Sequence, residues 1–264
     1  MRPIKAVLIF SHIILGLILL VLTGALWNPR SKAVKVTKAW WLGRVLRLLN
    51  MDVEVSGDLP TPKTEGPGRI LVSNHVSWLD IPLIGSLQQI NFLSKAEVKN
   101  WPLIGTLAEG VGTLFIQRGS GDANMITKQI ADRVEEGHSV LFFPEGTTTD
   151  GSSVKGFHKK LFKACDYVDC EFQPVVINYE VQGEPINPVA FIDDDEFAEH
   201  LWHLLSFSHI KARIEFLPVR KFSSENLKQQ VQDLEQEMRR KVEVRSRKIN
   251  LTPNGEEIPS PASA

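Results

Sequence analysis

The stretch Arg69–Asp80, RILVSNHVSWLD, decides the fold, because a short apolar run leads directly into a turn that carries ionisable side chains. Its first five residues are typical of a buried strand. Similar runs recur along the chain with helical patterns between them, and this alternation predicts an α/β fold, a mixed sheet flanked by helices. The runs are RILVS (69–73), INFLS (90–94), GTLFIQ (112–117), SVLFF (139–143), FQPVVIN (172–178), VAFI (189–192) and ARIEFLPV (212–219).

Two helices are expected among these runs. Asp122–Glu136 has a helical pattern that stops at Gly137, a residue favoured just past a helix end. Ser223–Arg247 carries apolar side chains at helical spacing and cations in its last turns, which predicts an amphipathic helix. The tail, residues 250–264, is too poor in apolar side chains to pack and is expected to be disordered. We therefore predict one main domain over residues 51–249, preceded by a separate N-terminal part, residues 1–50.

That N-terminal part begins with an uncharged run, Ala6–Trp27. About 20 apolar residues suffice to cross the hydrocarbon core of a bilayer as a helix. A cleaved signal peptide is the alternative, although this run exceeds the usual apolar core of about 7 to 15 residues. Basic residues flank the run and are more numerous after it, which favours a membrane helix with the main domain on the cytoplasmic side.

The next helix, Val36–Asn50, has two interpretations. It can lie in the headgroup zone of the bilayer, where paired tryptophans and cations are common. It can also pack on the core of the main domain. Both interpretations keep that domain near the bilayer. The expected apolar face holds Trp41, Val45, Leu48 and Leu49, with the cations Lys38, Arg44 and Arg47 elsewhere.

Composition excludes some classes of partner. The 30 Lys and Arg against 31 Asp and Glu give a formal charge of −1, which provides no basic excess for nucleic-acid binding. Cys165 and Cys170 fit no metal-ligand spacing and are too few for a disulfide-stapled secreted domain. His200 and His203 follow a run of acids, 193–196, but the acids also suit a helix start. We therefore expect no metal.

His75 and Asp80 are the candidate catalytic residues. They stand at the end of an apolar run and about one helical turn apart, so the imidazole and the carboxylate can meet. A neutral histidine, with an unperturbed pKa of about 6.5, can accept a hydroxyl proton, and a carboxylate on its other nitrogen fixes the tautomer. A lone histidine is more often structural, so the pair alone leaves both roles open.

Two later segments also end predicted strands. Gly112–Arg118 delivers an arginine to the carboxyl end of its strand, where open α/β sheets usually build their sites, and arginine there can hold a phosphate. Phe142–Gly151, FFPEGTTTDG, turns through proline and glycine with a carboxylate at its tip. Taken singly, this second segment is equally typical of an ordinary strand-end turn.

In this order the segments resemble the glycerolipid acyltransferase family, typified by lysophosphatidate acyltransferases, with its motifs Asn-His-x-x-x-x-Asp, Gly-x-x-Phe-x-x-Arg and Phe-Pro-Glu-Gly-Thr. All three match, and a looser fourth match covers residues 173–177. The resemblance implies that His75 is the general base and Asp80 its partner. It implies further that Gly112 and Arg118 belong to an acceptor-phosphate site.

By the same resemblance, Glu145, Gly146 and Thr147 bind or position the acceptor. Lys95 is either a further phosphate ligand or a solvated surface lysine. The implied partners are membrane lipids and a thioester donor, acyl-CoA or acyl carrier protein. The implied reaction acylates lysophosphatidate to phosphatidate in the 51–249 catalytic domain, with no cofactor. Two alternatives stay open: another acceptor such as lyso-ornithine lipid, and a silent lipid-binding scaffold.

Overall fold

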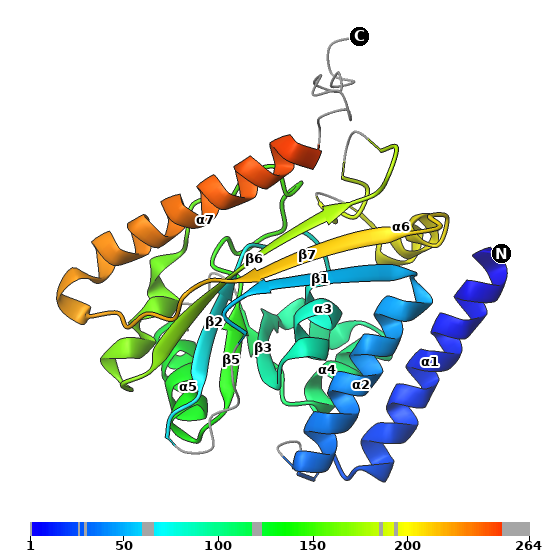
Figure 1. Cartoon of the computed structure of the whole chain (residues 1–264). Coiled ribbons are helices and arrows are strands. Elements are labelled where there is room, and N and C mark those ends of the chain that lie inside the picture. Colours follow the sequence, from blue (N-terminus) through cyan, green and yellow to red (C-terminus); the bar gives the residue numbers. More distant parts are fainter. Residues whose placement is uncertain are drawn as a thin grey trace.

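A seven-stranded sheet forms the centre of the computed structural model, with helices on both of its faces (Figure 1). The structure describes residues 2–25, 27–28, 31–59, 66–117, 123–184, 187–192 and 195–249. The predicted α/β fold with a mixed sheet is therefore confirmed. The strands are β1 (Met51–Gly57), β2 (Arg69–Ser73), β3 (Ile90–Lys95), β4 (Leu114–Ile116), β5 (Ser139–Phe142), β6 (Glu171–Glu180) and β7 (Ile210–Phe216), in the order β1-β7-β6-β2-β5-β3-β4.

Five strands run the same way and end at one edge of the sheet. β2 is parallel to β5 and β6, β3 is parallel to β5, and β4 is parallel to β3. β7 is antiparallel to β6 and carries β1 beside it in parallel. The carboxyl edge of these five parallel strands is the place where the segments after β2 and β5 meet.

The prediction of a strand at VAFI was wrong. Residues 189–192 form a loop, although Val189 is fully buried. The Phe191 N–H donates to the carbonyl of Val76 at 2.9 Å, so the backbone of this loop bonds to the turn after β2 and joins no strand ladder.

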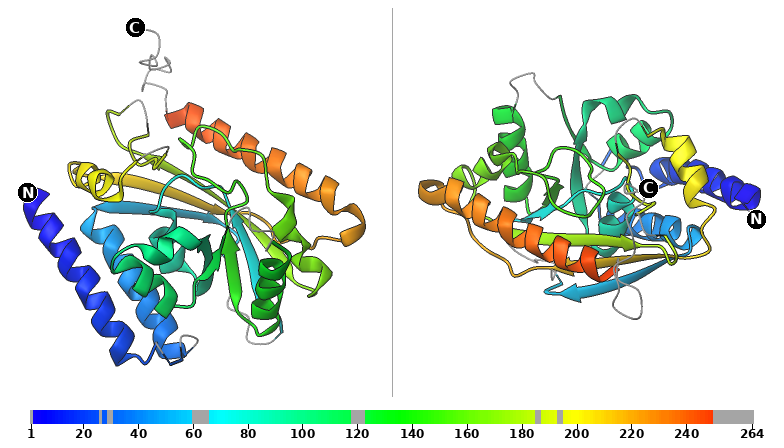
Figure 2. Two further views of the ribbon diagram at one scale, coloured as in Figure 1. Left: turned by 180° about the vertical axis from the view of Figure 1, so that it is seen from behind. Right: turned by 90° about the horizontal axis from the view of Figure 1, so that it is seen from above.

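Helices lie in two layers, one on each face of the sheet (Figure 2), and alternate side chains of the central strands face different layers. Ile70 and Val72 belong to a core shared with one layer, whereas Leu71 belongs to the core on the other side. The first layer contains α5 (Ala123–Glu135), η2 (Lys159–Asp166), η3 (Ser224–Asn226) and α7 (Leu227–Ile249). The second contains α2 (Lys32–Leu48), α3 (Asp80–Leu87), η1 (Ala96–Asn100), α4 (Ile104–Gly110) and α6 (Phe197–Leu204), with α1 (Arg2–Leu22) outside α2.

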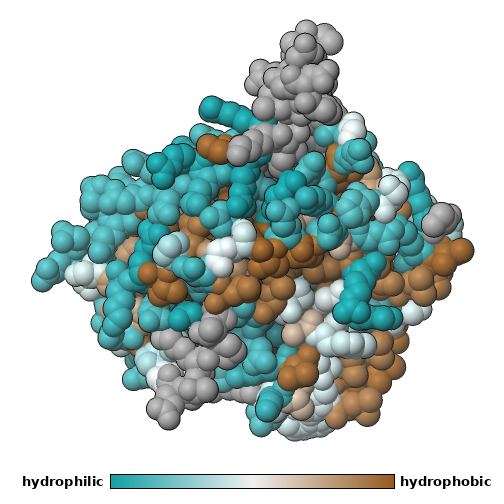
Figure 3. Space-filling model, viewed as in Figure 1, coloured by the Kyte–Doolittle hydropathy of each residue, from teal (hydrophilic) through white to brown (hydrophobic). Residues whose placement is uncertain are grey.

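α1 is long and apolar enough to cross a membrane by length and composition, although a core helix or a signal sequence would pass the same test. It packs beside α2 through one face, where the Trp41 indole N–H donates to the His12 carbonyl at 2.9 Å. Gly16 lies against the Trp41 ring. The opposite face is apolar and exposed, and hydrophobic side chains gather there in the space-filling view (Figure 3). Its large exposed residues are Ile4, Val7, Leu8, Phe10, Ile14, Leu15, Ile18, Val21 and Leu22.

α2 packs on the main domain, in contact with α3 and β1. The expected position of Lys38 away from the apolar face was wrong. Lys38 is buried with Val34, Leu42 and Leu46, and its ammonium donates to the carbonyl of Ile90. Burial lowers the pKa of Lys38 to about 8. The long apolar stem of lysine lets it join a packed face while its head finds a carbonyl.

The two later helices were predicted correctly. α5 is followed by Gly137 at a φ of 83°, the left-handed conformation that glycine adopts without strain. α7 covers one face of the sheet and buries Val231, Leu234 and Met238. The expected disordered tail lies outside the described residues.

Candidate active site

His75 and Asp80 meet at the carboxyl edge of β2. The Nδ1 atom of His75 lies 2.8 Å from Oδ2 of Asp80. Asp80 is the first residue of α3, so one tight turn carries both side chains. A carboxylate that accepts a hydrogen bond from Nδ1–H keeps the proton on that nitrogen, so Nε2 carries the lone pair that a general base needs. The His75 side chain is 21% exposed, so a substrate can reach it, whereas Asp80 is fully buried.

Asp80 is bound by four donors. Its Oδ2 also accepts the backbone N–H groups of Val76 at 2.8 Å and Ser77 at 3.1 Å. Its Oδ1 accepts the hydroxyl of Tyr179 at 2.7 Å. A buried polar group is costly unless it is hydrogen-bonded, and these four donors satisfy both oxygens of Asp80 and fix the orientation of its side chain.

The main chain of His75 is held by the turn after β5. Its N–H donates to Oε1 of Glu145 at 2.8 Å, and its carbonyl accepts the Thr149 N–H at 2.8 Å. The imidazole stacks on Phe143, with ring centroids 3.8 Å apart and planes 10° apart. The segments around His75 and Glu145, 70 residues apart in sequence, therefore form one unit.

The buried Glu145 carboxylate links two backbone segments in this structure. Its second oxygen accepts the Lys155 N–H at 2.7 Å, so both carboxylate oxygens are bound to backbone groups. Burial raises the pKa of Glu145 to about 7, and the two backbone hydrogen bonds only partly offset that effect. The expected role in binding or positioning the acceptor stays a prediction; the described contacts are those of a residue that holds the loop around His75.

The other expected site residues lie on several elements of the fold. Gly146, with a φ of 70°, and half-exposed Thr147 continue the Glu145 turn beside it. Lys95 ends β3 at the same edge and is exposed. Gly112 lies before β4, at the opposite edge, and its carbonyl accepts the Asn91 amide at 2.9 Å. Arg118 lies outside the described residues, so its role in phosphate binding stays a prediction.

A second set of contacts ties the turn after β2 to α6. The Trp78 indole N–H donates to Nδ1 of His200 at 3.1 Å. Nε2 of His200 lies 3.0 Å from the carbonyl of Ala190. Both ring nitrogens of His200 thus bind protein groups, and burial lowers its pKa. The ring has a structural role between the turn and the 189–192 loop.

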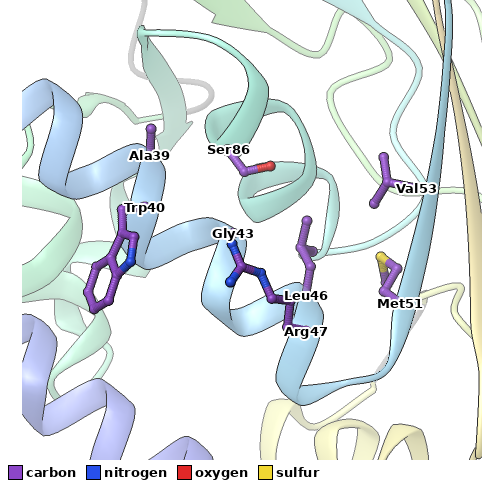
Figure 4. A pocket seen from close by; sticks show the side chains of 8 residues that line it. All are labelled: Ala39, Trp40, Gly43, Leu46, Arg47, Met51, Val53 and Ser86. Atoms are coloured by element: carbon purple, nitrogen blue, oxygen red, sulfur yellow. The ribbon is translucent and has the colours of Figure 1, made fainter.

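An open groove lies away from this site. It has a volume of about 380 Å³ and runs between α2, α3 and β1, with none of the His75 site residues in its lining (Figure 4). Trp40 and Arg47 from α2, Ser86 from α3 and Val53 from β1 surround it. The candidate site at His75 therefore rests on its polar contacts, because this groove lies apart from it.

Two residues of the site were not expected from the sequence. Tyr179 lies 99 positions from Asp80, so no local pattern connects them. Asn74 belongs to the first motif, which gives it no separate role. Its amide nitrogen donates to the Ile177 carbonyl at 2.9 Å, and its amide oxygen accepts the Ile177 N–H at 2.8 Å. It binds β6 where β2 has ended. Its place directly after an apolar run and before His75 was the available signal.

The fold and the site together indicate a class of enzyme that deprotonates a hydroxyl group with a histidine base. A histidine held by a buried carboxylate can take the proton of a hydroxyl, and the same chain carries an apolar helix long enough to cross a membrane. A match to the acyltransferase family model over residues 52–178 agrees with this class.

The chain belongs to the acyltransferase family, in its lysophospholipid type. It is 42% identical over 219 residues to a lyso-ornithine lipid O-acyltransferase of Pseudomonas aeruginosa, covering 80% of this chain and 83% of that protein. It is 31% identical over 181 residues to a 1-acyl-sn-glycerol-3-phosphate acyltransferase of Neisseria meningitidis, covering 67% and 69%. The crystal structure of the lysophosphatidate acyltransferase PlsC of Thermotoga maritima shares the fold, with a TM-score of 0.63 at 22% identity over 92% of this chain and 97% of that one.

Proposed function

We propose that this protein transfers a fatty acyl group from a thioester, acyl-CoA or acyl-acyl carrier protein, to the free hydroxyl of lyso-ornithine lipid at a membrane surface. The main observation that supports acyl transfer is the hydrogen bond between His75 Nδ1 and Asp80 Oδ2. The 42% identity to a lyso-ornithine lipid O-acyltransferase over most of both chains supports this acceptor.

The geometry supports a single-displacement reaction. Nε2 of His75 accepts the proton of the acceptor hydroxyl while the oxygen attacks the thioester carbonyl. The tetrahedral intermediate then expels the thiolate, which takes the proton back from the imidazolium. Asp80 holds the Nδ1 proton throughout and stabilises the positive charge on the ring. The thioester is already activated, so the residues need only hold and deprotonate the hydroxyl.

Lysophosphatidate is the second candidate acceptor. It was the leading expectation from the sequence motifs, and the similarity to the Neisseria meningitidis protein supports it. The two acceptors differ in charge, because lysophosphatidate carries a phosphomonoester that lyso-ornithine lipid lacks. An arginine fork suits such a phosphate, and Arg118 is the residue proposed for that contact.

The proposal is tested with purified full-length protein in mixed micelles or vesicles. Release of the thiol from acyl-CoA and from acyl-acyl carrier protein is measured with lyso-ornithine lipid and with lysophosphatidate as acceptors. We expect a higher kcat/KM for lyso-ornithine lipid and no competition by inorganic phosphate. The reverse preference, with phosphate competing against the acceptor, would assign lysophosphatidate. His75→Ala is the control that separates enzymatic transfer from spontaneous hydrolysis.

A further inference from the structure

Asp80 depends on one donor from a distant part of the chain. Three of its hydrogen bonds come from His75, Val76 and Ser77, all within the same turn. These three bonds all reach Oδ2, whereas the hydrogen bond to Oδ1 within the described part of the chain comes from the Tyr179 hydroxyl. We propose that Tyr179 is a positioning residue of the reaction, which orients Asp80 and, through it, the His75 ring.

The sheet explains how Tyr179 reaches this place. β6 is longer than β2, whose last residue, Ser73, pairs with Val175. Beyond that point the Asn74 side chain takes over the pairing with Ile177. Ile177 and Tyr179 share the face of β6 that packs against the layer containing α3. The overhang of β6 therefore carries the phenol to the first residue of α3.

The state of the phenol fits this role. Tyr179 is 3% exposed, and burial, followed by the negative charge of Asp80, raises its pKa well above the usual value. The hydroxyl therefore stays protonated at any pH where the enzyme works and acts as a donor. Loss of this donor leaves a fully buried carboxylate oxygen without a partner, a costly state that favours rotation of Asp80 away from His75.

Removal of the hydroxyl alone is the informative change. Tyr179→Phe keeps the apolar ring that packs in the core and deletes one oxygen. Because a hydrogen bond to a charged group is worth roughly a factor of 10 to 100, we expect kcat to fall by that range while the KM of both substrates stays the same. The chain contains two tyrosines, and Tyr167 is 54% exposed, so Tyr167→Phe is the matched control with unchanged kinetics.

A double-mutant cycle shows whether the effect passes through Asp80. Steady-state kinetics are measured for wild type, Tyr179→Phe, Asp80→Asn and the double variant, at a temperature where thermal melts show all four to be folded. We expect Tyr179→Phe to reduce kcat strongly in the wild type and little in the Asp80→Asn background. Equal losses in both backgrounds would overturn the proposal, as would a stable Tyr179→Phe variant with normal kcat.

The inference rests on the proposed acyl transfer, and His75→Ala separates the two. Full turnover in His75→Ala would refute the proposed mechanism itself. An inactive His75→Ala beside a fully active Tyr179→Phe would refute only the role of Tyr179. A loss of activity that follows a lower melting temperature, and that disappears when the assay is cooled below the melt, would show a structural role and also overturn the inference.

Discussion

The imidazole of His75 is fixed through its main chain as well as through its ring. Glu145 and Thr149 hold its N–H and carbonyl, while Asp80 holds Nδ1 and Phe143 lies against the ring plane. A base held in this way needs little rearrangement when the proton moves. The local motif predicts the meeting of His75 and Asp80, because they lie five positions apart in sequence. The contacts of Glu145 and Tyr179 could not be predicted, because they depend on the order of strands in the sheet.

We expect His75→Ala to lower turnover by about 100- to 10,000-fold, the usual range for the loss of a general base. Folding should be retained, because the side chain is partly exposed and its backbone bonds remain available to alanine. Steady-state kinetics with a thermal melt check this. Near-normal turnover in a folded variant would contradict the proposed role.

Glu145 makes stability depend on pH. Its pKa rises from 4.5 to about 7 in the folded state, so between these values the folded chain holds a proton that the unfolded chain has lost. Stability therefore falls as pH rises from about 4.5 to about 7, and Glu145 adds no further change above that window. Glu145→Gln cannot titrate, so its melting temperature should fall less steeply over the same window. Parallel melting curves against pH for both proteins would contradict the expectation.

At the scale of elements, most helices and strands follow from periodicity, and the exceptions have physical reasons. The 189–192 run is apolar because it is buried, but its backbone bonds to the turn after β2 and not to a strand. Lys38 lies on the buried face of α2, because its ammonium can donate a hydrogen bond to the Ile90 carbonyl there. In both cases the sequence pattern could not show which backbone group the segment bonds to, and that partner decides the structure.

The packing of α1 on α2 gives a prediction with a matched control. A Cβ on Gly16 would lie 2.8 Å from the Trp41 ring, which is held by its bond to His12. A Cβ on Gly43 would meet Ser86 at 3.5 Å, an ordinary contact. Alanine is the better helix former by about 0.5–1 kcal/mol, so Gly43→Ala should be neutral or stabilising. Gly16→Ala should instead destabilise by about 1–3 kcal/mol, because the clash outweighs that gain.

Denaturation of both variants in the same micelles measures the difference. An equal gain for Gly16→Ala and Gly43→Ala would show that α1 does not pack on Trp41 in solution as it does in this structure. A loss confined to Gly16→Ala would support the packed hairpin of α1 and α2.

For the whole molecule, the predictable part was the pair of helical layers and the apolar start of the chain. The strand order was not predictable, because β1 pairs with β7, and this pairing joins Met51 to Ile210 in a distant part of the sequence. The cytoplasmic placement of the main domain and the boundaries at residues 50 and 250 stay predictions.

Deletion of residues 1–30 should release the protein from membranes into the soluble or aggregated fraction. The cut keeps Ser31, whose hydroxyl caps α2, and keeps Leu46 and Leu49 in the core. It removes the exposed apolar face of α1. A point variant on that face, Ile18→Asp, should weaken binding while leaving the buried face of α1 intact. Sedimentation with washed liposomes measures both, and full sedimentation of the deletion protein would show that another surface is the anchor.

The placement of one helical layer on each face of the sheet has a consequence for the kinetics. The layer with α1 and α2 carries the exposed apolar surface, the layer with α5 and α7 lies on the opposite face of the sheet, and β2, which leads into His75, lies between the two. Under the proposed acyl transfer, we expect the lysolipid to reach this edge from the plane of the lipid and the thioester to reach it from water. We expect the rate to follow the mole fraction of lysolipid within the bilayer, so inert lipid added at constant total lysolipid would slow the enzyme by surface dilution alone.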